Sequence, residues 1–265
     1  MSAIKEFQNI MIKKGYDFYL VPTADYHNSE YISDYFKVRA FLSDFTGSAG
    51  TLLITQKNAY LWVDGRYFIQ AAKQIEGTSI TLMKMGTPNT PTLLEFLREN
   101  VKANMKLVFD GKLVNTMLAR EIKENIDRNA IIKTNDDTID EIWEERPKMP
   151  FSLLYMLDTF YTGKTYKEKL DEVLKKLAEK NVDTFILSAL EDQAWLFNLR
   201  ANDVSHTPVF LAFTVITNNN VTLFIDQRKL DIKVSKLTYS EITEEILVSY
   251  GEEYVHEYPK LNFHH

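Results

Sequence analysis

An internal repeat constrains the fold of this 265-residue chain more than any other feature of its sequence. Residues 215–228, Val-Ile-Thr-Asn-Asn-Asn-Val-Thr-Leu-Phe-Ile-Asp-Gln-Arg, align without a gap on residues 53–66, Leu-Ile-Thr-Gln-Lys-Asn-Ala-Tyr-Leu-Trp-Val-Asp-Gly-Arg. Each copy has two apolar runs separated by a polar turn, which is typical of a β-hairpin. The repeat therefore indicates that one supersecondary plan is used twice.

Helix and strand patterns alternate along both copies. A helix pattern over 4–14 leads into a strand over 17–21, and the same order recurs as 166–180 into 183–187. After the first hairpin we expect strands over 79–85, 107–110 and 131–132, and helices over 66–75, 90–101 and 116–126. This rhythm predicts an α/β fold in which each domain has a mixed sheet with flanking helices. The first sheet should be mostly parallel and carry one antiparallel hairpin.

Two prolines mark a boundary in the middle of the chain. Pro147 and Pro150 follow a short helix pattern over 138–144, and proline resists both helix and sheet ladder. We therefore place one domain at 1–148 and a second at 151–265.

The second domain has fewer elements than the first. After its hairpin, only 242–248 and 254–258 carry a regular pattern, whereas the first domain continues through another strand-helix-strand-helix set. By the repeat argument, we expect the second domain to be truncated at its C-terminus and the chain to be part of a longer protein.

The composition of the chain limits the binding partners and the cellular location that we expect for it. The net charge is −6 and no cluster of lysine and arginine stands out, so neither nucleic acid nor an anionic membrane is favoured as a partner. No run approaches the roughly 18 apolar residues of a membrane helix. The chain contains no cysteine, which excludes disulfides and thiolate metal sites within it. We expect a cytoplasmic protein.

Residues that could carry hydrolytic chemistry are dispersed. Apart from the terminal pair, the histidines are His27, His206 and His256, with no His-Glu-x-x-His motif and no close Asp/His cluster, so we predict no metal site. Asp25 and His27 offer only two ligands, a pattern more typical of hydrogen bonding in a loop. Ser48 lacks the spacing of a nucleophile elbow and is interpreted as a turn residue. We assign no catalytic residue, and the roles of His27 and His206 stay open.

Arg66 is the most informative charged residue. It follows Asp64 at a helix start, where a cation gains nothing from the helix dipole. Either the pair braces the turn, or Arg66 presents its guanidinium to a carboxylate on a substrate or a neighbouring domain. The repeated Asp226 and Arg228 favour bracing, because a structural turn is duplicated with the fold.

Other repeated or aromatic residues are interpreted as structural. Arg39 and Arg200 recur 161 residues apart and receive the same bracing interpretation. Trp62, Trp143 and Trp195 each lie in an apolar register, which predicts that they belong to the core.

Several motifs occur together and in order along nearly the whole chain. They are Phe45-Thr-Gly-Ser-Ala-Gly-Thr51, Trp62-Val-Asp-Gly-Arg-Tyr-Phe68, Ser29-Glu-Tyr31, Ile142-Trp143 with Arg146-Pro147, Ala194-Trp-Leu-Phe-Asn-Leu-Arg200 and Pro208-Val-Phe210. In these motifs the chain resembles the N-terminal half of three-domain, creatinase-like Xaa-Pro aminopeptidases (aminopeptidase P, peptidase family M24). The resemblance implies two tandem creatinase N-terminal-type domains, which in that family precede a pita-bread catalytic domain that is absent here.

The resemblance also implies a function. Such hydrolases remove the N-terminal residue from Xaa-Pro peptides with two divalent metal ions, commonly manganese, held by the C-terminal domain. The implied partners are that missing catalytic domain, a second subunit in a homodimer, and proline-containing peptides; the present chain alone is expected to be inactive. Glu30 and Arg66 match positions that face the substrate entrance in similar proteins.

Two alternatives remain. The chain could be a stand-alone, non-enzymatic binding or regulatory module built on the creatinase N-terminal fold. It could also be a creatinase or prolidase relative, which is less favoured because those proteins have one N-terminal domain and this chain shows two.

Overall fold

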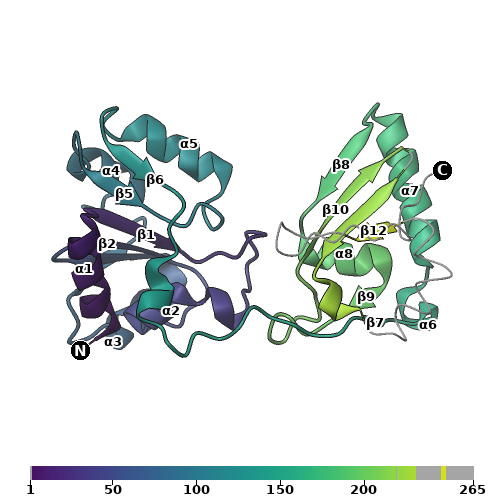
Figure 1. Ribbon diagram of the computed structural model, residues 1–265, viewed down its shortest axis with the longest axis horizontal. Helices are drawn as coiled ribbons and strands as arrows, with labels where there is room; N and C mark the ends of the chain where they lie inside the picture. Colours follow the sequence, from purple (N-terminus) through teal and green to yellow (C-terminus); the bar gives the residue numbers. More distant parts are fainter. Residues whose placement is uncertain (1, 219, 231–245, 249–265) are drawn as a thin grey trace. The chain divides into compact units, whose positions relative to one another are not determined.

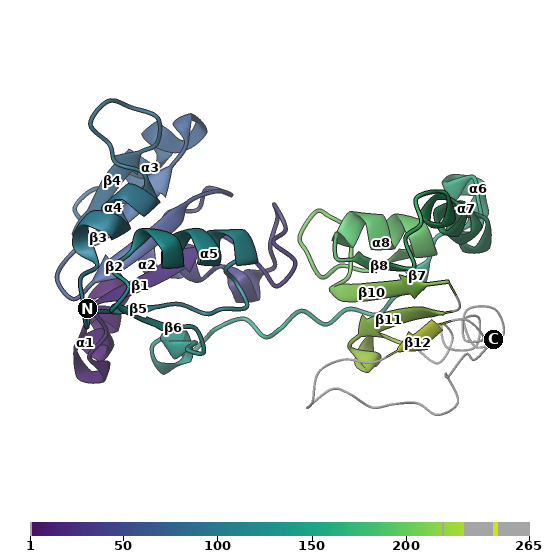
Figure 2. The same ribbon diagram turned by 90° about the horizontal axis from the view of Figure 1, so that it is seen from above.

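The structure, a computed structural model, describes residues 2–218, 220–230 and 246–248. The chain divides into two compact units, Met1–Lys148 and Met149–His265. Each unit is a mixed α/β structure and is described by itself below (Figures 1 and 2).

The first unit is built on a six-stranded sheet. Its elements are α1 (Ala3–Lys14), β1 (Phe18–Pro22), η1 (Asp34–Phe36), α2 (Val38–Ser43), β2 (Thr51–Thr55), β3 (Ala59–Val63), η2 (Gly65–Tyr67), α3 (Phe68–Gln74), β4 (Ile80–Lys84), α4 (Leu93–Asn100), β5 (Lys106–Val108), α5 (Thr116–Asn125), β6 (Ile131–Lys133) and η3 (Thr138–Glu141). The strand order is β4-β3-β2-β1-β5-β6. Only β2 runs against its neighbours, so the predicted, mostly parallel sheet with one antiparallel hairpin is confirmed.

Both faces of this sheet are covered. Alternate residues of a strand point to opposite faces, so Leu52 and Leu53 on β2 belong to two different clusters. Leu52 packs with Phe7 of α1, and Leu53 packs with Leu97 of α4 and Ile122 of α5. The first unit is therefore a three-layer structure with helices on both sides (Figure 1).

Capping interactions set the helix ends. α1 ends at Lys14 and is capped by Gly15, which adopts a left-handed conformation with φ of 66°. α4 begins at Leu93, later than the expected range 90–101, because Thr92 and Glu95 form a capping box. The helix expected over 138–144 is instead the short 3₁₀ segment Thr138–Glu141.

The second unit repeats the first four strands. Its elements are β7 (Tyr155–Met156), α6 (Thr159–Thr162), α7 (Tyr166–Glu179), β8 (Thr184–Leu187), α8 (Leu190–Phe197), β9 (Leu199–Arg200), β10 (Ala212–Thr217), β11 (Val221–Ile225), η4 (Gln227–Lys229) and β12 (Ile246–Val248). The order β12-β11-β10-β8 and the directions of pairing reproduce those of β4-β3-β2-β1. β7 and β9 form a separate pair.

The residue register confirms the predicted duplication. Val215 lies opposite Ile186 as Leu53 lies opposite Leu20. In the described part of the second unit, no counterparts of β5 and β6 follow. The pattern expected over 254–258 lies outside the described residues.

One expected core residue is at the surface. Trp62 is buried as predicted, but 49% of Trp195 is exposed. The buried side of α8 carries Leu190, Ala194 and Phe197, so Trp195 is left to pack beside Lys169, whose Nζ lies 4.7 Å from the ring centroid.

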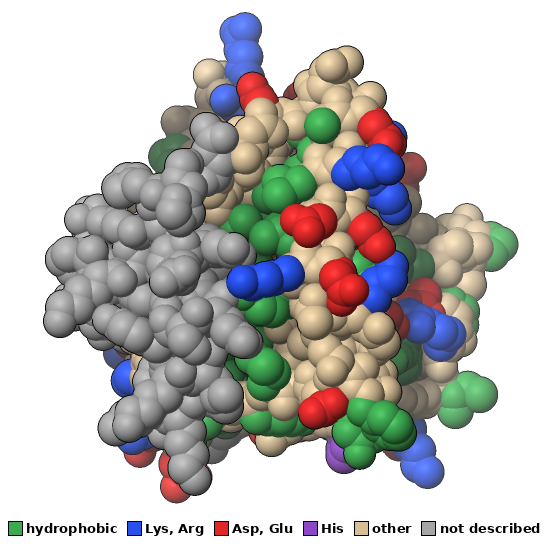
Figure 3. All heavy atoms as spheres, turned by 90° about the vertical axis from the view of Figure 1, so that its right-hand side faces the viewer, with side chains coloured by type: hydrophobic (Ala, Val, Ile, Leu, Met, Phe, Trp, Pro, Cys, Tyr) green, Lys and Arg blue, Asp and Glu red, His purple; other side chains and the backbone are tan. Residues whose placement is uncertain are grey.

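On the side of the second unit seen in Figure 3, acidic and basic side chains are interspersed.

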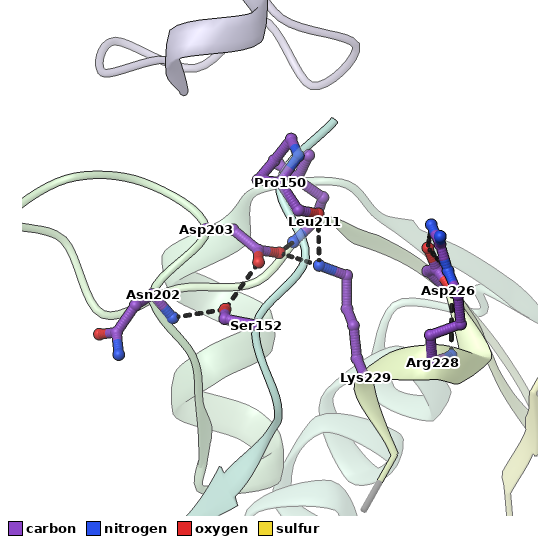
Figure 4. A network of polar contacts seen from close by, with 8 residues as sticks. All are labelled: Pro150, Ser152, Asn202, Asp203, Leu211, Asp226, Arg228 and Lys229. Carbon is purple, nitrogen blue, oxygen red and sulfur yellow. Dashed lines mark hydrogen bonds and ion pairs between the residues drawn. The ribbon is translucent and has the colours of Figure 1, made fainter. Parts of the chain in front are cut away.

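A buried ion pair fixes the start of the second unit. Lys229 and Asp203 are almost fully buried, and Lys229 Nζ lies 2.5 Å from Asp203 Oδ2. Lys229 Nζ also donates to the carbonyl of Pro150, and Asp203 accepts hydrogen bonds from Ser152 Oγ and from the Leu211 amide (Figure 4). The segment behind the two prolines is thereby held against the hairpin.

Asp203→Ala is expected to lower the free energy of unfolding of the second unit by about 3–5 kcal/mol, because Lys229 would be left buried without a counter-charge. Urea and thermal unfolding would measure the loss. Asp226→Ala is the matched control, since its partner Arg228 is largely exposed and its removal should cost about 1 kcal/mol or less. Equal losses in the two variants would contradict this account.

Candidate functional site

Three loops of the first unit meet at one edge of its sheet. β1 and β3 run in the same direction and β2 runs against them, so the ends of β1 and β3 lie beside the start of β2. The loops concerned are 23–33 after β1, 44–50 before β2 and 64–67 after β3. Strand-end loops at one sheet edge are a common location for binding sites.

Arg39 holds the middle loop in place. Its Nε donates to Thr23 Oγ1 at 2.7 Å, Nη1 donates to the Phe45 carbonyl at 2.9 Å, and Nη2 donates to the Gly47 carbonyl. Burial lowers the pKa of Arg39 to about 10, so the guanidinium stays charged at neutral pH. The bracing interpretation is confirmed for Arg39.

The loop is also packed closely against Tyr67. A Cβ on Gly47 would meet the rings of Phe45 and Tyr67, so only glycine fits there. Ser48 Oγ and Tyr67 Oη are 2.7 Å apart. Ser48 is thus a turn residue, as predicted. The sequence analysis gave no structural role to Tyr67, although this residue lies within the Asp-Gly-Arg-Tyr motif.

Arg66 is braced by Asp64. The Arg66 Nε and Nη2 atoms each donate to a different carboxylate oxygen of Asp64 at 2.9 Å, and the Arg66 amide donates to Oδ1 at 3.0 Å. The same pattern joins Arg228 to Asp226. The bracing interpretation is therefore confirmed in both copies.

Bracing leaves one side of the Arg66 guanidinium available. The Arg66 side chain is 61% exposed, and within the described part of the chain its Nη1 donates to no protein atom. Hydrogen bonding to Asp64 raises the pKa of Arg66, and the charge of Glu30 contributes in the same direction. Glu30 lies on a different loop, 23–33, and its charge is the smallest of these contributions to the pKa of Arg66. A pre-oriented and exposed guanidinium suits a carboxylate on a ligand.

His27 and His206, the two histidines that the structure describes, do not add a metal site. Among the described residues, no group of three or more His, Asp and Glu side chains could hold a metal ion. Asp25 Oδ1 accepts the amides of His27 and Ser29, both at 2.9 Å, which confirms its predicted hydrogen-bonding role. His206 lies in a loop with φ of 64°. No described helix is long and apolar enough to cross a membrane.

Comparison with known proteins agrees with this duplicated α/β architecture. Residues 4–142 match a family model described as the Creatinase/Prolidase N-terminal domain, and residues 145–260 match a second model with the same description. The chain therefore belongs to the creatinase/prolidase N-terminal domain family, as the resemblance of its motifs indicated.

Its relatives are peptidases. The chain is 37% identical over 234 residues to a probable Xaa-Pro aminopeptidase P of Coprinopsis cinerea and 36% identical over 237 residues to one of Tuber melanosporum, covering 87% and 88% of this chain. An X-prolyl aminopeptidase from Caenorhabditis elegans, described as a cytosolic enzyme with a di-nuclear active site, superposes with a TM-score of 0.79 at 29% identity over 88% of this chain. The matched region spans only 37%, 38% and 38% of these three proteins.

Arg66→Met is expected to raise the pKa of Asp64, because hydrogen bonds from Arg66 hold that pKa below its ordinary value. In the unsubstituted chain, the Asp64–Arg66 pair stabilises the fold at pH values above the unfolded-state pKa of Asp64, which is about 3.9. That stabilisation is lost as the pH falls through the lower, folded-state pKa. NMR titration of the carboxyl carbons would measure the change. Arg228→Met is the control and should shift Asp226 instead; an unmoved Asp64 in Arg66→Met would refute the account.

Proposed function

We propose that this chain is the N-terminal, substrate-gating and dimer-forming part of a metallo-aminopeptidase that releases the N-terminal residue from Xaa-Pro peptides. The observation that carries the proposal is the similarity of nearly the whole chain, at 36–37% identity, to the first two-fifths of proteins named Xaa-Pro aminopeptidase P. The superposition on the nematode enzyme supports the same assignment.

The chemistry itself is assigned to another part of the parent protein. The described residues do not fit a metal pair, because they offer no group of three donor side chains. We place the two divalent ions, manganese by the family resemblance, in the region of the relatives that this chain does not match. The present chain alone is then inactive.

The role proposed for Glu30 and Arg66 is at the substrate entrance. A short peptide carries an ammonium group at one end and a carboxylate at the other, and the two side chains supply the opposite charges. Asp64 holds the Arg66 guanidinium in a fixed orientation, so less side-chain entropy is lost on contact with a peptide. The proposed location is the cytoplasm, where the nematode relative is described.

A stand-alone binding module is the second candidate. The observation in its favour is that the loops around Arg66 form an internally bonded site in which the described residues provide neither a metal site nor an activated nucleophile. Such a module would bind peptides without cleaving them.

Hydrolysis of Arg-Pro-Pro distinguishes the two candidates. With manganese added, a longer native polypeptide that contains this chain should release arginine, whereas the 265-residue chain should show no turnover and no stoichiometric metal. Chelator-sensitive turnover by the 265-residue chain would overturn the assignment of catalysis to another region. Absence of activity in every longer native form would favour the binding module.

In the active parent enzyme, Arg66→Ala should lower kcat/KM for short Xaa-Pro peptides by about fivefold, as expected for one exposed charge contact. Glu30→Ala should act in the same direction. Steady-state kinetics would measure both, and Arg228→Ala, the equivalent residue of the second unit, serves as the matched control. Unchanged kinetics and unchanged dimerisation in Arg66→Ala would remove the functional role.

A further inference from the structure

The loop before the hairpin and the residue after the Asp-x-Arg turn bind a carboxylate in the second unit. Asp203 Oδ2 accepts the Leu211 amide at 2.8 Å and lies 2.5 Å from Lys229 Nζ (Figure 4). The gap-free register of the two hairpins makes Ala49 the equivalent of Leu211. The same register makes Tyr67 the equivalent of Lys229. The duplicated fold therefore has a carboxylate-binding place, which a side chain of the chain itself fills in the second unit.

The first unit keeps this place but not its carboxylate. Asp203 is replaced there by the apolar, buried Leu42, three residues beyond the repeated arginine. Within the described part of the chain, the amide of Ala49 donates to no protein acceptor. Ala49 is half-buried, and a partly buried amide needs an acceptor from elsewhere. This amide is therefore a donor available to a ligand.

A hydroxyl proton is available beside the same amide. Tyr67 Oη and Ser48 Oγ are 2.7 Å apart, and each hydroxyl carries one proton. One proton forms this hydrogen bond, and none of the described residues forms a second one with either oxygen. The other proton is therefore left for an acceptor. Tyr67 and Ser48 are both half-buried, so the pair is accessible from solvent.

The loop is held in place from both sides. Arg39 binds the carbonyl groups of Phe45 and Gly47 from inside. On the other side, Gln74 Nε2 donates to Thr46 Oγ1 at 2.9 Å, and the Thr46 amide donates to Gln74 Oε1 at 3.1 Å. Because the donors of the loop are positioned in advance, little conformational entropy is lost when a ligand binds.

We propose that the place between Ala49 and Tyr67 binds the carboxylate of a ligand, as the equivalent place of the second unit binds Asp203. The Ala49 amide and the Ser48–Tyr67 hydroxyl pair are the donors. Arg66 supplies positive charge nearby, since its Cζ lies 5.1 Å from the centroid of the Tyr67 ring. Tyrosine carries no charge where the second unit has lysine, so the ligand binds reversibly.

The occupant is the C-terminal carboxylate of a short peptide. This choice rests on the proposed function, and an acidic side chain of another protein is the alternative source of the same group. The readout is binding to the 265-residue chain and not hydrolysis. The site can therefore fail while the peptidase assignment stands, and the reverse.

NMR titration of the 265-residue chain with Arg-Pro-Pro tests the site. The Ala49 amide proton should shift to higher frequency, while the Leu211 amide proton, already bound to Asp203, stays in place as an internal control. Arg-Pro-Pro with an amidated C-terminus should cause no shift, and aspartate blocked at both ends should cause a smaller one. No shift with Arg-Pro-Pro, an equal shift with the amidated peptide, or a larger shift with blocked aspartate would each overturn the proposal.

Two substitutions of Tyr67 give opposite expectations. Tyr67→Phe keeps the ring that packs against Gly47 and should raise the dissociation constant for Arg-Pro-Pro about fivefold, as for the loss of one hydrogen bond. Tyr67→Lys should lower it by a similar factor, because it supplies the charge that Lys229 provides in the second unit. Tyr60→Phe, at the other end of β3, is the matched control and should change nothing. Unchanged affinity in Tyr67→Phe would overturn the proposal.

Discussion

The architecture depends on one constraint, the insertion of an antiparallel strand between two parallel ones. β2 pairs with β1 on one side and β3 on the other, and β10 has the same place in the second unit. The reversal brings the ends of β1 and β3 next to the loop that precedes β2. It also fixes which residues of each strand face which layer. The loop cluster around Arg66 and the two apolar faces of the sheet therefore share a single cause.

The hairpins and turns could be predicted from the sequence because they depend on local chemistry. The strands Thr51–Thr55 and Ala59–Val63 coincide with their apolar runs, and the Asp64–Arg66 brace could be inferred from its recurrence. The surface position of Trp195 could not, since it depends on which side of α8 meets the sheet. Nor could the three carbonyl and hydroxyl partners of Arg39, which are assembled only when separate loops meet.

The two copies show how one motif can serve different surroundings. Both Asp-x-Arg turns have the same bidentate geometry, but Arg66 lies over Tyr67, whereas Arg228 lies over Phe151. The brace belongs to the duplicated fold, and the neighbours distinguish the copies. The binding role that we propose for the first turn therefore rests on the loops around it and not on the arginine itself.

The buried Lys229–Asp203 ion pair at the start of the second unit also bears on the order of events during synthesis of the chain. The Lys229–Asp203 pair, which holds residues 150–154, joins residues far apart in sequence. During synthesis the first unit can complete its sheet before Lys229 has been translated, since its own strands end at Lys133. The segment behind the prolines can be fixed only after the second hairpin has formed. These contacts of the second unit can therefore be completed only after the strands of the first unit have been synthesised.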